Sequence, residues 1–423
     1  MTITGPCNAP DVLDVVALGE SMVTFLPTRP GRLADVPSFE RGIGGAESNV
    51  ACALAAAGHR TGWVSRVGAD GFGDHLVEAI TGYGVDLSAV RRDPVRPTGV
   101  YFRTAGDRAT DAHEVAYYRA GSAASAMSVE NVDLSAARSG RVLHLSGITA
   151  ALSDSCLGLM RRLTASEEGR PVVSFDVNHR AGLWGDRDGR GVLLELARGA
   201  DVVFVGEDEA EEAWGVTGGP EAVRTALPEP GVLVVKQGAV GATAFVSAAG
   251  GRGPAAPTRR SRTGISPAPL GSASGQALQG AQPAATRSTQ PAGSRAAGAA
   301  PVPQRVGAPP ARASDPTPAP AQAPSTFVPA LTVDVVSAIG AGDAFAAGFL
   351  SATLRGLPVR VALRHGHLWA AAALTTPGDL ATPPSRDHAD RLAALDDAGW
   401  EKLRLGPGWT QAAERADEEV RTP

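Results

Sequence analysis

Cysteine, lysine and long apolar runs are scarce in this sequence, and each scarcity narrows what the protein can be. Its three cysteines, Cys7, Cys52 and Cys156, show neither CxxC spacing nor a histidine at metal spacing, so we expect reduced, structural thiols rather than a zinc or redox site. No segment approaches the roughly 20 apolar residues of a membrane span. The N-terminus carries acids where a signal peptide is basic and then apolar. We therefore expect a cytoplasmic protein without a membrane partner.

Charge is limited in amount and uneven in kind. The 423 residues have a formal net charge of −5, with 43% hydrophobic and 20% charged residues. This composition supplies a core of domain size and gives no reason to expect nucleic acid as a partner. Nearly all of the positive charge is arginine, because Lys236 and Lys402 are the only lysines.

Several common catalytic motifs are absent. The chain has no GxxxxGK[ST], and no GxGxxG follows its first predicted strand, which excludes a P-loop and a dinucleotide-binding turn. It has no HExxH, no GxSxG and no histidine pair at metal spacing. Zinc hydrolysis and serine esterase chemistry therefore have no candidate residues.

What the sequence does contain is an alternation of strands and helices. Mostly apolar strands are predicted at 12–18, 61–67, 142–145, 172–175, 202–205, 232–236, 242–246 and 331–336. Helices are predicted at 47–57, 74–83, 154–163, 207–214, 343–354 and 359–374. Strands of this kind are covered on both faces. We therefore expect an α/β fold with a doubly wound, mostly parallel sheet flanked by helices, and with ligands at the carboxyl ends of the strands.

Two alternating runs, 99–104 and 114–119, interrupt this rhythm. We expect them to pair as a hairpin that is either an edge ribbon or a small cover over the ligand end of the sheet. A Gly-rich turn is expected at 40–45, before the first helix.

The composition changes abruptly between the predicted strands 242–246 and 331–336. Residues 249–326 contain no aromatic residue and a single acid, Asp315, so they cannot bury a core and are predicted to be a disordered insertion. Its arginines are scattered, which favours a solvated tether over a nucleic-acid or membrane site. Residues 399–423 are predicted to be a polar C-terminal tail.

The most informative stretch is Ser-Ala-Ile-Gly-Ala-Gly-Asp at 337–343, between a predicted strand and a predicted helix. Glycine at 340 and 342 lets backbone N–H groups and the helix dipole face an anion. A carboxylate at Asp343 repels a phosphate, so it suits a base that takes a proton from a hydroxyl attacking that phosphate. The alternative is a simple helix cap after a Gly-rich turn.

Polar residues also follow several other predicted strands. Asp176, Asn178, Arg180, Glu209 and Lys236 all stand at or just past a strand end. Each alone is more simply a cap or a surface ion pair. Their shared placement predicts a site at the carboxyl edge of the sheet.

These blocks resemble the PfkB, or ribokinase-like, carbohydrate kinases. The early turn Gly44-Gly45-Ala46-Glu47-Ser48-Asn49 and the late turn Gly340-Ala341-Gly342-Asp343 are similar to two motifs of that family. The resemblance runs from about residue 12 to 384, without the insertion. Blocks at 117–123, 143–149 and 176–184 look most like those of 2-keto-3-deoxygluconate kinases, and fructokinases share parts of them.

The resemblance implies a kinase domain made of residues 12–248 and 327–398. It also implies a small β-sheet lid, from about 19–44 and 97–120, through which such proteins often dimerise. ATP and Mg²⁺ are the implied cofactors.

Roles for individual residues follow from the same resemblance. Asp343 would be the base, and the N–H groups of Gly340, Ala341 and Gly342 would hold the transferring phosphate. The sugar would be lined by Gly45, Asn49, Tyr101, Tyr117, Arg119, Asn178 and Arg180. Glu209 would order magnesium-bound water. The nucleotide would lie against Lys236, Gly238, Gly241 and His367.

Four positions depart from the family pattern. Ser337 and Ala338 stand where the family usually has Asp-Thr, which removes a carboxylate associated with monovalent-cation binding. Gly206 and His367 stand where the family has asparagine, near the acidic motif and the adenine. All four lie at the nucleotide or cation end, whereas the sugar-side blocks are intact.

Two classes of function fit these residues. The first is ATP-dependent phosphorylation of the terminal hydroxyl of 2-keto-3-deoxygluconate, whose carboxylate Arg119 and Arg180 can clamp. Fructokinase or another sugar-kinase activity is the alternative within the family. The second class is a non-catalytic sugar-acid sensor that contacts a partner through its tether.

Overall fold

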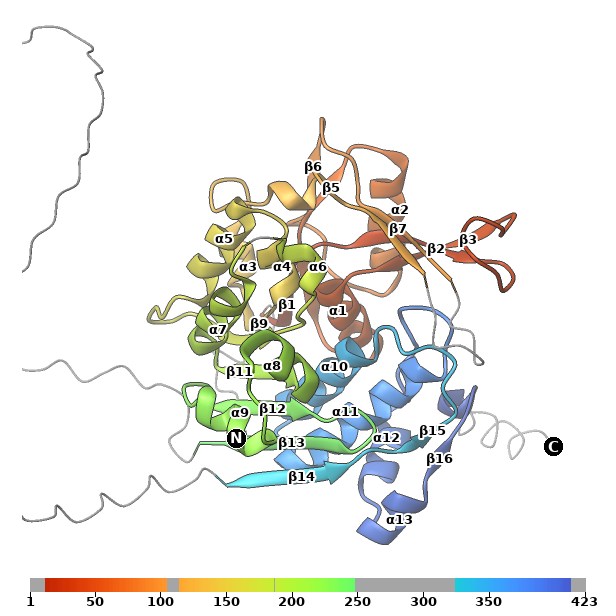
Figure 1. Ribbon diagram of the computed structural model, residues 1–423, viewed down its shortest axis with the longest axis vertical. Helices are drawn as coiled ribbons and strands as arrows, with labels where there is room; N and C mark the ends of the chain where they lie inside the picture. The colour runs from red at the N-terminus through yellow and green to blue at the C-terminus, as the bar shows by residue number, and fades with distance from the viewer. Residues whose placement is uncertain (1–11, 105–113, 186, 248–323, 412–423) are drawn as a thin grey trace, which may run out of the picture. The chain divides into compact units, whose positions relative to one another are not determined.

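An eight-stranded sheet forms the centre of the computed structural model (Figure 1), which describes residues 12–104, 114–185, 187–247 and 324–411. Its strands are β1 (Leu13–Leu18), β4 (Thr61–Val64), β9 (Gly140–Ser146), β10 (Val172–Asp176), β11 (Val202–Gly206), β12 (Val232–Lys236), β13 (Gly241–Val246) and β14 (Ser325–Pro329). Their order in the sheet is β14-β13-β12-β11-β10-β9-β1-β4. The six strands from β12 to β4 are parallel, and β13 is antiparallel to both β12 and β14. This confirms the doubly wound, mostly parallel sheet.

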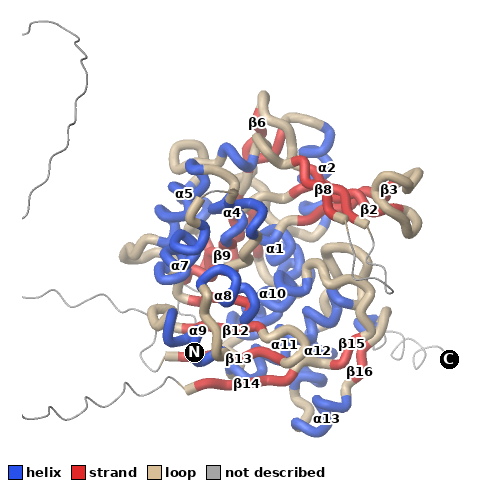
Figure 2. The backbone as a smooth tube through the Cα atoms, viewed as in Figure 1, coloured by secondary structure: helices blue, strands red, loops and turns tan. Residues whose placement is uncertain are grey.

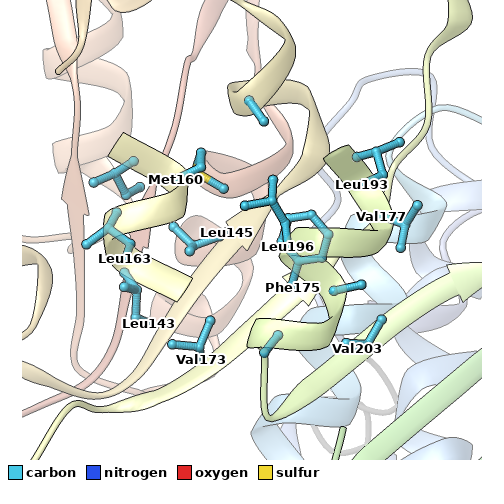
Figure 3. Close-up of a cluster of buried hydrophobic side chains, with 14 of the residues drawn as sticks. Leu143, Leu145, Met160, Leu163, Val173, Phe175, Val177, Leu193, Leu196 and Val203 are labelled. Carbon is cyan, nitrogen blue, oxygen red and sulfur yellow. The ribbon is translucent and has the colours of Figure 1, made fainter. Parts of the chain in front are cut away.

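Both faces of this sheet are buried. Successive residues of each strand point to opposite sides, so one strand can contribute to two hydrophobic clusters. In β11, Val203 and Val205 belong to one hydrophobic cluster, whereas Val202 and Phe204 belong to another. Figure 3 shows the first cluster, where Leu143 and Phe175 of the sheet pack with side chains from the covering helices. The near-continuous apolar character of the strands therefore has a direct cause.

Helices cover the two faces as separate layers (Figures 1 and 2). The cluster with Leu143 is closed by α3 (Leu134–Ala137), α4 (Gly147–Ala151), α5 (Asp154–Thr164), α6 (Ala181–Trp184), α7 (Gly189–Gly199), α8 (Glu207–Trp214) and α9 (Pro220–Ala226). The cluster with Phe204 is closed by α1 (Ala46–Ala56), α10 (Ala341–Leu354), α11 (Val359–Leu374), α12 (Arg386–Ala393) and α13 (Asp397–Lys402). Helix α2 (Gly71–Gly82) packs in a third cluster, with Trp63 and Val23.

A separate four-stranded sheet, in the order β3-β2-β7-β8, stands beside the main one (Figure 2). Its strands are β2 (Met22–Pro27), β3 (Phe39–Gly44), β7 (Val100–Arg103) and β8 (Val115–Tyr118). The hairpin expected from 99–104 and 114–119 is confirmed as the antiparallel pair β7–β8. The turn expected at 40–45 is wrong, because β3 continues to Gly44 in antiparallel pairing with β2.

The segment that precedes the glycine turn at 340–343 differs from the prediction. The run 331–336 forms only β15 (Thr332–Val333), which pairs with β16 (Arg404–Leu405) outside the main sheet. The strand that pairs with β13 at the edge of the main sheet is β14. The backbone beyond β15 is held by other partners, since Val336 N donates to Leu374 O at 2.7 Å. Local apolar character could not show that the sheet was already complete.

The described part of the predicted C-terminal tail, residues 399–411, contains regular structure, whereas residues 412–423 lie outside the described residues. Residues 397–411 include α13, β16 and a short 3-10 turn at Trp409–Gln411. Trp400 and Trp409 are buried, and Trp400 Nε1 donates to Pro329 O at 2.9 Å. These two indoles tie the segment to the main body, because burial of a large aromatic surface stabilises packing.

The remaining elements are short. Strand β5 (Arg66–Gly68) pairs with β6 (Arg91–Asp93), so the strand predicted at 61–67 is divided at Ser65. Cys52 and Cys156 are buried and free, and burial raises the pKa of the Cys52 thiol to about 12. None of the helices in the described ranges has the length and apolar character needed to span a bilayer. Cys7 and nearly all of the predicted insertion lie outside the described residues.

Candidate active site

A cavity of about 460 Å³ lies at the carboxyl ends of the parallel strands. It is lined by residues from the main sheet, the small sheet, α1, α10 and the turn after α11: Glu20, Met22, Gly44, Gly45, Ala46, Asn49, Tyr101, Arg103, Val115, Tyr117, Arg119, Ile148, Asp176, Asn178, Arg180, Glu209, Lys236, Ala338, Ile339, Gly340, Gly342, Asp343 and Asp379. Open α/β sheets bind ligands at this edge. The cavity therefore brings the early glycines Gly44 and Gly45 and the late glycines Gly340 and Gly342 into one site.

The N-terminus of α10 forms one wall of this cavity. Gly340 is its N-cap, with φ +77 and ψ −6, a left-handed conformation that favours glycine. A Cβ at this position would lie 2.2 Å from Asp379 O, so no side chain fits there. Ala344 N donates to Gly340 O at 2.9 Å. The N–H groups before it, at the start of the helix, have no partner within the helix and can receive an anion.

Asp343 stands in the first turn of α10 and is held across the cavity floor by α1. Asn49 Nδ2 donates to Asp343 Oδ2 at 2.8 Å. Burial raises the pKa of Asp343 to about 7, although the hydrogen bond from Asn49 and the charge of Lys236 oppose the rise. The negative charges of Asp176 and Glu47 add to it. A carboxylate with a pKa near neutrality is suited to accept a proton.

Lys236 brings a positive charge to the same place. At the end of β12, its Nζ donates to both carboxylate oxygens of Asp176, at 3.1 Å each. Its Nζ is 3.5 Å from the position a Cβ would take on Gly342. Burial opposes the charge, yet Asp176, Glu209 and Asp343 together raise the pKa of Lys236 above its ordinary value. An ammonium group is therefore held beside the first turn of α10.

Two carboxylates, Glu209 and Asp176, lie near Lys236, which already donates to both oxygens of Asp176. Both line the cavity, and burial raises the pKa of Glu209 with a further contribution from Asp176. Glu209 Oε2 also accepts a hydrogen bond from Gly206 N at 2.7 Å. The described residues contain no cluster of three metal-ligating side chains. Mg²⁺ commonly binds through one or two carboxylates together with substrate phosphates and water, so Glu209 and Asp176 are the candidate side chains for it.

Asn178 is one of the polar residues that line the cavity. It lies two residues past β10, is buried and has φ 41, a left-handed conformation that asparagine tolerates. Its Oδ1 has no hydrogen-bond partner within the described residues. A buried polar atom of this kind normally has a partner, so this oxygen is an exception among the described residues.

The two arginines expected to clamp a carboxylate have different environments. Arg119 is already paired, because its Nε donates to Glu20 Oε2 at 2.7 Å and both side chains are nearly buried. Ser122 Oγ donates to the other Glu20 oxygen at 2.5 Å. The side chain of Arg180 is 55% exposed, and its closest carboxylate oxygen, on Glu209, is 3.9 Å away. Of the two, Arg180 is the guanidinium available to an incoming carboxylate.

The structure brings most of the predicted residues together and leaves three apart. Lining the cavity are Asp343, Gly340, Gly342, Gly45, Asn49, Tyr101, Tyr117, Arg119, Asn178, Arg180, Lys236 and Glu209. Ala341 lies between two of these at the start of α10. Gly238, Gly241 and His367 do not line it.

His367 and Gly241 both lie at packing contacts within the protein. His367 is buried, its Nε2 is 3.2 Å from Val328 O, and its ring packs edge-on against Phe345 at 5.2 Å. A Cβ on Gly241 would lie 2.4 Å from Val328 O, so glycine there permits the close pairing of β13 and β14. His367 is therefore a core residue.

Sequence reasoning missed four polar residues of the site. Glu20, Arg103 and Asp379 line the cavity, and the fully buried Glu47 accepts hydrogen bonds from Ser146 and Thr149 just behind it. Asp379 ends a Pro-Gly-Asp sequence at 377–379, whose residue types indicate a turn and nothing more. Its partner Arg103 is 276 residues away, a pairing that no local pattern contains.

The chain is similar to known carbohydrate kinases. The family model described as pfkB family carbohydrate kinase matches residues 12–262 and 307–386. The 2-dehydro-3-deoxygluconokinase of Thermoproteus tenax is 38% identical over 238 residues, which are 55% of this chain and 72% of that protein. The 2-dehydro-3-deoxygluconokinase of Bacillus subtilis (strain 168) is 36% identical over 202 residues, 47% of this chain and 62% of that protein.

Other sugar kinases are similar as well. Fructokinase-1 of Zea mays is 31% identical over 204 residues, 48% of this chain and 62% of that protein. The alignments with the Bacillus and maize proteins thus span less than two thirds of their length. Among solved structures, the PfkB protein from Polaromonas sp. JS666 is 28% identical with a TM-score of 0.64, covering 89% of this chain and 99% of that one.

Proposed function

This chain belongs to the PfkB family of carbohydrate kinases, and we propose that it transfers the γ-phosphate of ATP to the terminal hydroxyl of 2-keto-3-deoxygluconate. The observation that carries this proposal is Asp343, a half-buried carboxyl with a pKa of about 7 at the N-terminus of α10. A base and an anion-binding helix end, side by side, are what transfer of a phosphate to a hydroxyl requires.

Asp343 would begin the reaction as a carboxylate. It takes the proton of the terminal hydroxyl as the sugar oxygen attacks the γ-phosphorus, and the bond from that phosphorus to the bridging oxygen of ADP breaks. The products are the phosphorylated sugar acid, ADP and one proton held on Asp343. Asn49 holds one carboxylate oxygen through its 2.8 Å hydrogen bond, which would restrict the rotation of the base.

The transferring phosphate would be stabilised from two sides. Unpaired N–H groups of Ala341 and Gly342 begin α10 and supply donors with the positive end of the helix dipole. Lys236 adds a full positive charge close to Gly342. Fixed donors and charges of this kind are often the largest single contribution to the rate of phosphoryl transfer.

Magnesium would enter with the nucleotide phosphates. The carboxylates that face the cavity, Glu209 and Asp176, would hold its bound water, and the ion would neutralise phosphate charge. Lys236 lies between these carboxylates and the start of α10. The chain's own residues therefore separate a cation end from a sugar end.

The sugar acid is favoured over a neutral sugar by Arg180. Its exposed guanidinium can bind a carboxylate through two parallel hydrogen bonds. The names of the Thermoproteus and Bacillus relatives agree with this choice. Arg119 gives no such preference, because Glu20 already neutralises it.

Fructose is the second candidate substrate, for a specific reason. With Arg119 and Glu20 paired, much of the sugar end presents neutral hydrogen-bonding groups such as Asn178 and Tyr117. These groups suit a neutral ketose, and the maize fructokinase is similar to this chain.

The small sheet is the proposed lid and dimer contact. Its β7 and β8 bring Tyr101 and Tyr117 to the cavity. Tyr118, on the other side of β8, is 66% exposed and lines an apolar hollow with Phe72 and Val100. A dimer through this surface would elute at twice the mass of the chain in size-exclusion chromatography with light scattering, and a Tyr118→Glu variant would shift it to monomer.

A coupled assay of ADP release tests the proposed function. The enzyme is given MgATP with 2-keto-3-deoxygluconate, gluconate, fructose or ribose, and kcat/KM is compared. We expect the highest value for 2-keto-3-deoxygluconate. A higher value for fructose would establish the second candidate. No ADP release with any sugar, together with no heat of MgATP binding in calorimetry, would contradict a kinase.

A further inference from the structure

A buried ion pair joins the small sheet to the turn that follows α11. The side chains of Arg103, on β7, and Asp379 are only 2% and 3% exposed. Arg103 Nη2 donates to Asp379 Oδ1 at 2.7 Å and to Pro377 O at 2.8 Å, and Nε donates to the same Oδ1 at 3.1 Å. One guanidinium thus holds both ends of the turn 377–379.

The other carboxylate oxygen of Asp379 contacts residues at the end of the cavity proposed to bind the sugar. Tyr101, also on β7, donates its hydroxyl to Asp379 Oδ2. Burial and the negative charge of Asp379 raise the pKa of Tyr101, so the phenol keeps its proton and remains the donor. A Cβ on Gly44, at the end of β3, would lie 2.4 Å from Asp379 Oδ2 and 2.5 Å from the Tyr101 hydroxyl. Two strands of the small sheet therefore close around this carboxylate.

The backbone of Asp379 contacts the N-terminus of α10, where the phosphate is proposed to bind. Its carbonyl oxygen would be 2.2 Å from a Cβ on Gly340, which means that the turn 377–379 packs directly against the N-cap of α10. Gly340 sets the direction of the first helical N–H groups. A shift of Asp379 would therefore move or loosen the proposed phosphate site.

Stability alone gives little reason for this arrangement. Desolvation of two charges offsets most of their attraction, and apolar residues of similar volume often stabilise a protein equally well. What the ion pair supplies is a fixed distance between β7 and the start of α10, because a forked guanidinium has a narrow range of binding geometries.

We propose that Arg103 is a positioning residue, which through Asp379 sets the small sheet and the N-terminus of α10 in the arrangement that phosphate transfer needs. The kinetic consequence rests on the proposed kinase activity, whereas the structural coupling does not.

The first test is kinetic, with Arg103→Gln and Arg103→Lys. Since small misplacements at a reacting centre cost up to about 100-fold in rate, we expect R103Q to lower kcat by about 10- to 100-fold with KM for MgATP nearly unchanged. R103K keeps the charge but loses the fork, and it should recover part of the loss. Wild-type kcat in both variants would overturn the proposal.

A matched control separates positioning from general damage. Arg364 on α11 is also buried, donates to the carbonyls of Ala393 and Leu395, and pairs with Asp397 away from the cavity. Arg364→Gln should lower the unfolding temperature without a comparable change in kcat. A loss of kcat in R364Q equal to that in R103Q would show that any buried arginine has this effect, and would overturn the proposal.

Hydrogen exchange provides a readout that does not need activity. The amide of Ala344 closes the first turn of α10 through Gly340 O. If Arg103 braces this turn, Ala344 and Phe345 should exchange at least several-fold faster in R103K, relative to the middle of α10, and not in R364Q. Unchanged protection in R103K would refute the coupling. A wild-type protein that phosphorylates no sugar would refute the proposed function and leave this exchange test intact.

Discussion

Asn49 Nδ2 lies 2.8 Å from Asp343 Oδ2, and this hydrogen bond joins α1 to α10 through two residues that are 294 positions apart in the sequence. A donor of this kind stabilises the ionised carboxylate and lowers its pKa. Burial acts against it and prevails, so the pKa of Asp343 stays near 7. The balance between the two sets the pH at which the proposed base becomes active.

The first prediction concerns this balance. Asn49→Ala removes the donor, so the pKa of Asp343 should rise and the acidic limb of kcat/KM against pH should move to higher pH. The control is Asn131→Ala, on the surface and outside the cavity, whose profile should match the wild type. An acidic limb that stays in place, or moves to lower pH, in N49A contradicts the role assigned to Asn49.

Stability should also depend on pH through Asp343. Its folded pKa of about 7 lies above the ordinary aspartate pKa of 3.8, so the folded state holds a proton that the unfolded state releases between about pH 4 and 7. Stability from this group is therefore present at low pH and lost as pH rises through that window. Asp343→Asn should raise the unfolding temperature at pH 8, with a smaller gain at pH 5. A larger gain at pH 5 than at pH 8 would refute this sign.

The two arginines should separate in a substrate comparison. Arg180→Ala should weaken 2-keto-3-deoxygluconate far more than fructose, since only the acid brings a carboxylate; one charged hydrogen-bonded contact contributes about 1.5–3 kcal/mol. Arg119→Ala should weaken both sugars and lower the unfolding temperature, because it leaves the buried Glu20 carboxylate without its cation. Equal losses for both sugars in R180A would remove the carboxylate clamp.

Lys236 can be tested against the only other lysine of the chain. Lys236→Met removes the charge beside Gly342, so kcat should fall by about 10²- to 10³-fold, as for other groups that stabilise transition-state charge. The acidic limb should also move to higher pH, because Lys236 lowers the pKa of Asp343. Lys236→Arg should recover part of the rate. Lys402→Met, at the exposed end of α13, should change neither; wild-type kcat in K236M would refute the assignment.

Local sequence patterns predicted the elements whose surroundings are simple. The boundaries of β12 and of helices α8 and α11 follow from apolar runs and periodicity, as the structure has them. The run 331–336 has the same apolar character, but the strand that pairs with β13 in the sheet is β14. Helix α7 was missed because three glycines at 189, 191 and 199 weaken its helical signal.

The sequence predicted which residues lie in the site better than it predicted the contacts between them. Motif residues such as Asn49 and Asp343 converge as the resemblance implies. The partners that set their chemistry come from distant segments: Glu20 neutralises Arg119 from 99 residues away, and Asp379 holds Arg103 from 276 residues away. Charge and hydropathy along the chain contain no record of such pairs, so which arginine stays free for a ligand had to come from the structure.

The most direct test of the central claim is single-turnover phosphate transfer from MgATP to 2-keto-3-deoxygluconate by the wild type and Asp343→Asn. General-base catalysis contributes about 10²- to 10⁴-fold, so D343N should lose at least about 100-fold in rate while calorimetry shows sugar binding close to that of the wild type. Transfer at the wild-type rate by D343N would contradict the assignment of Asp343 as the base.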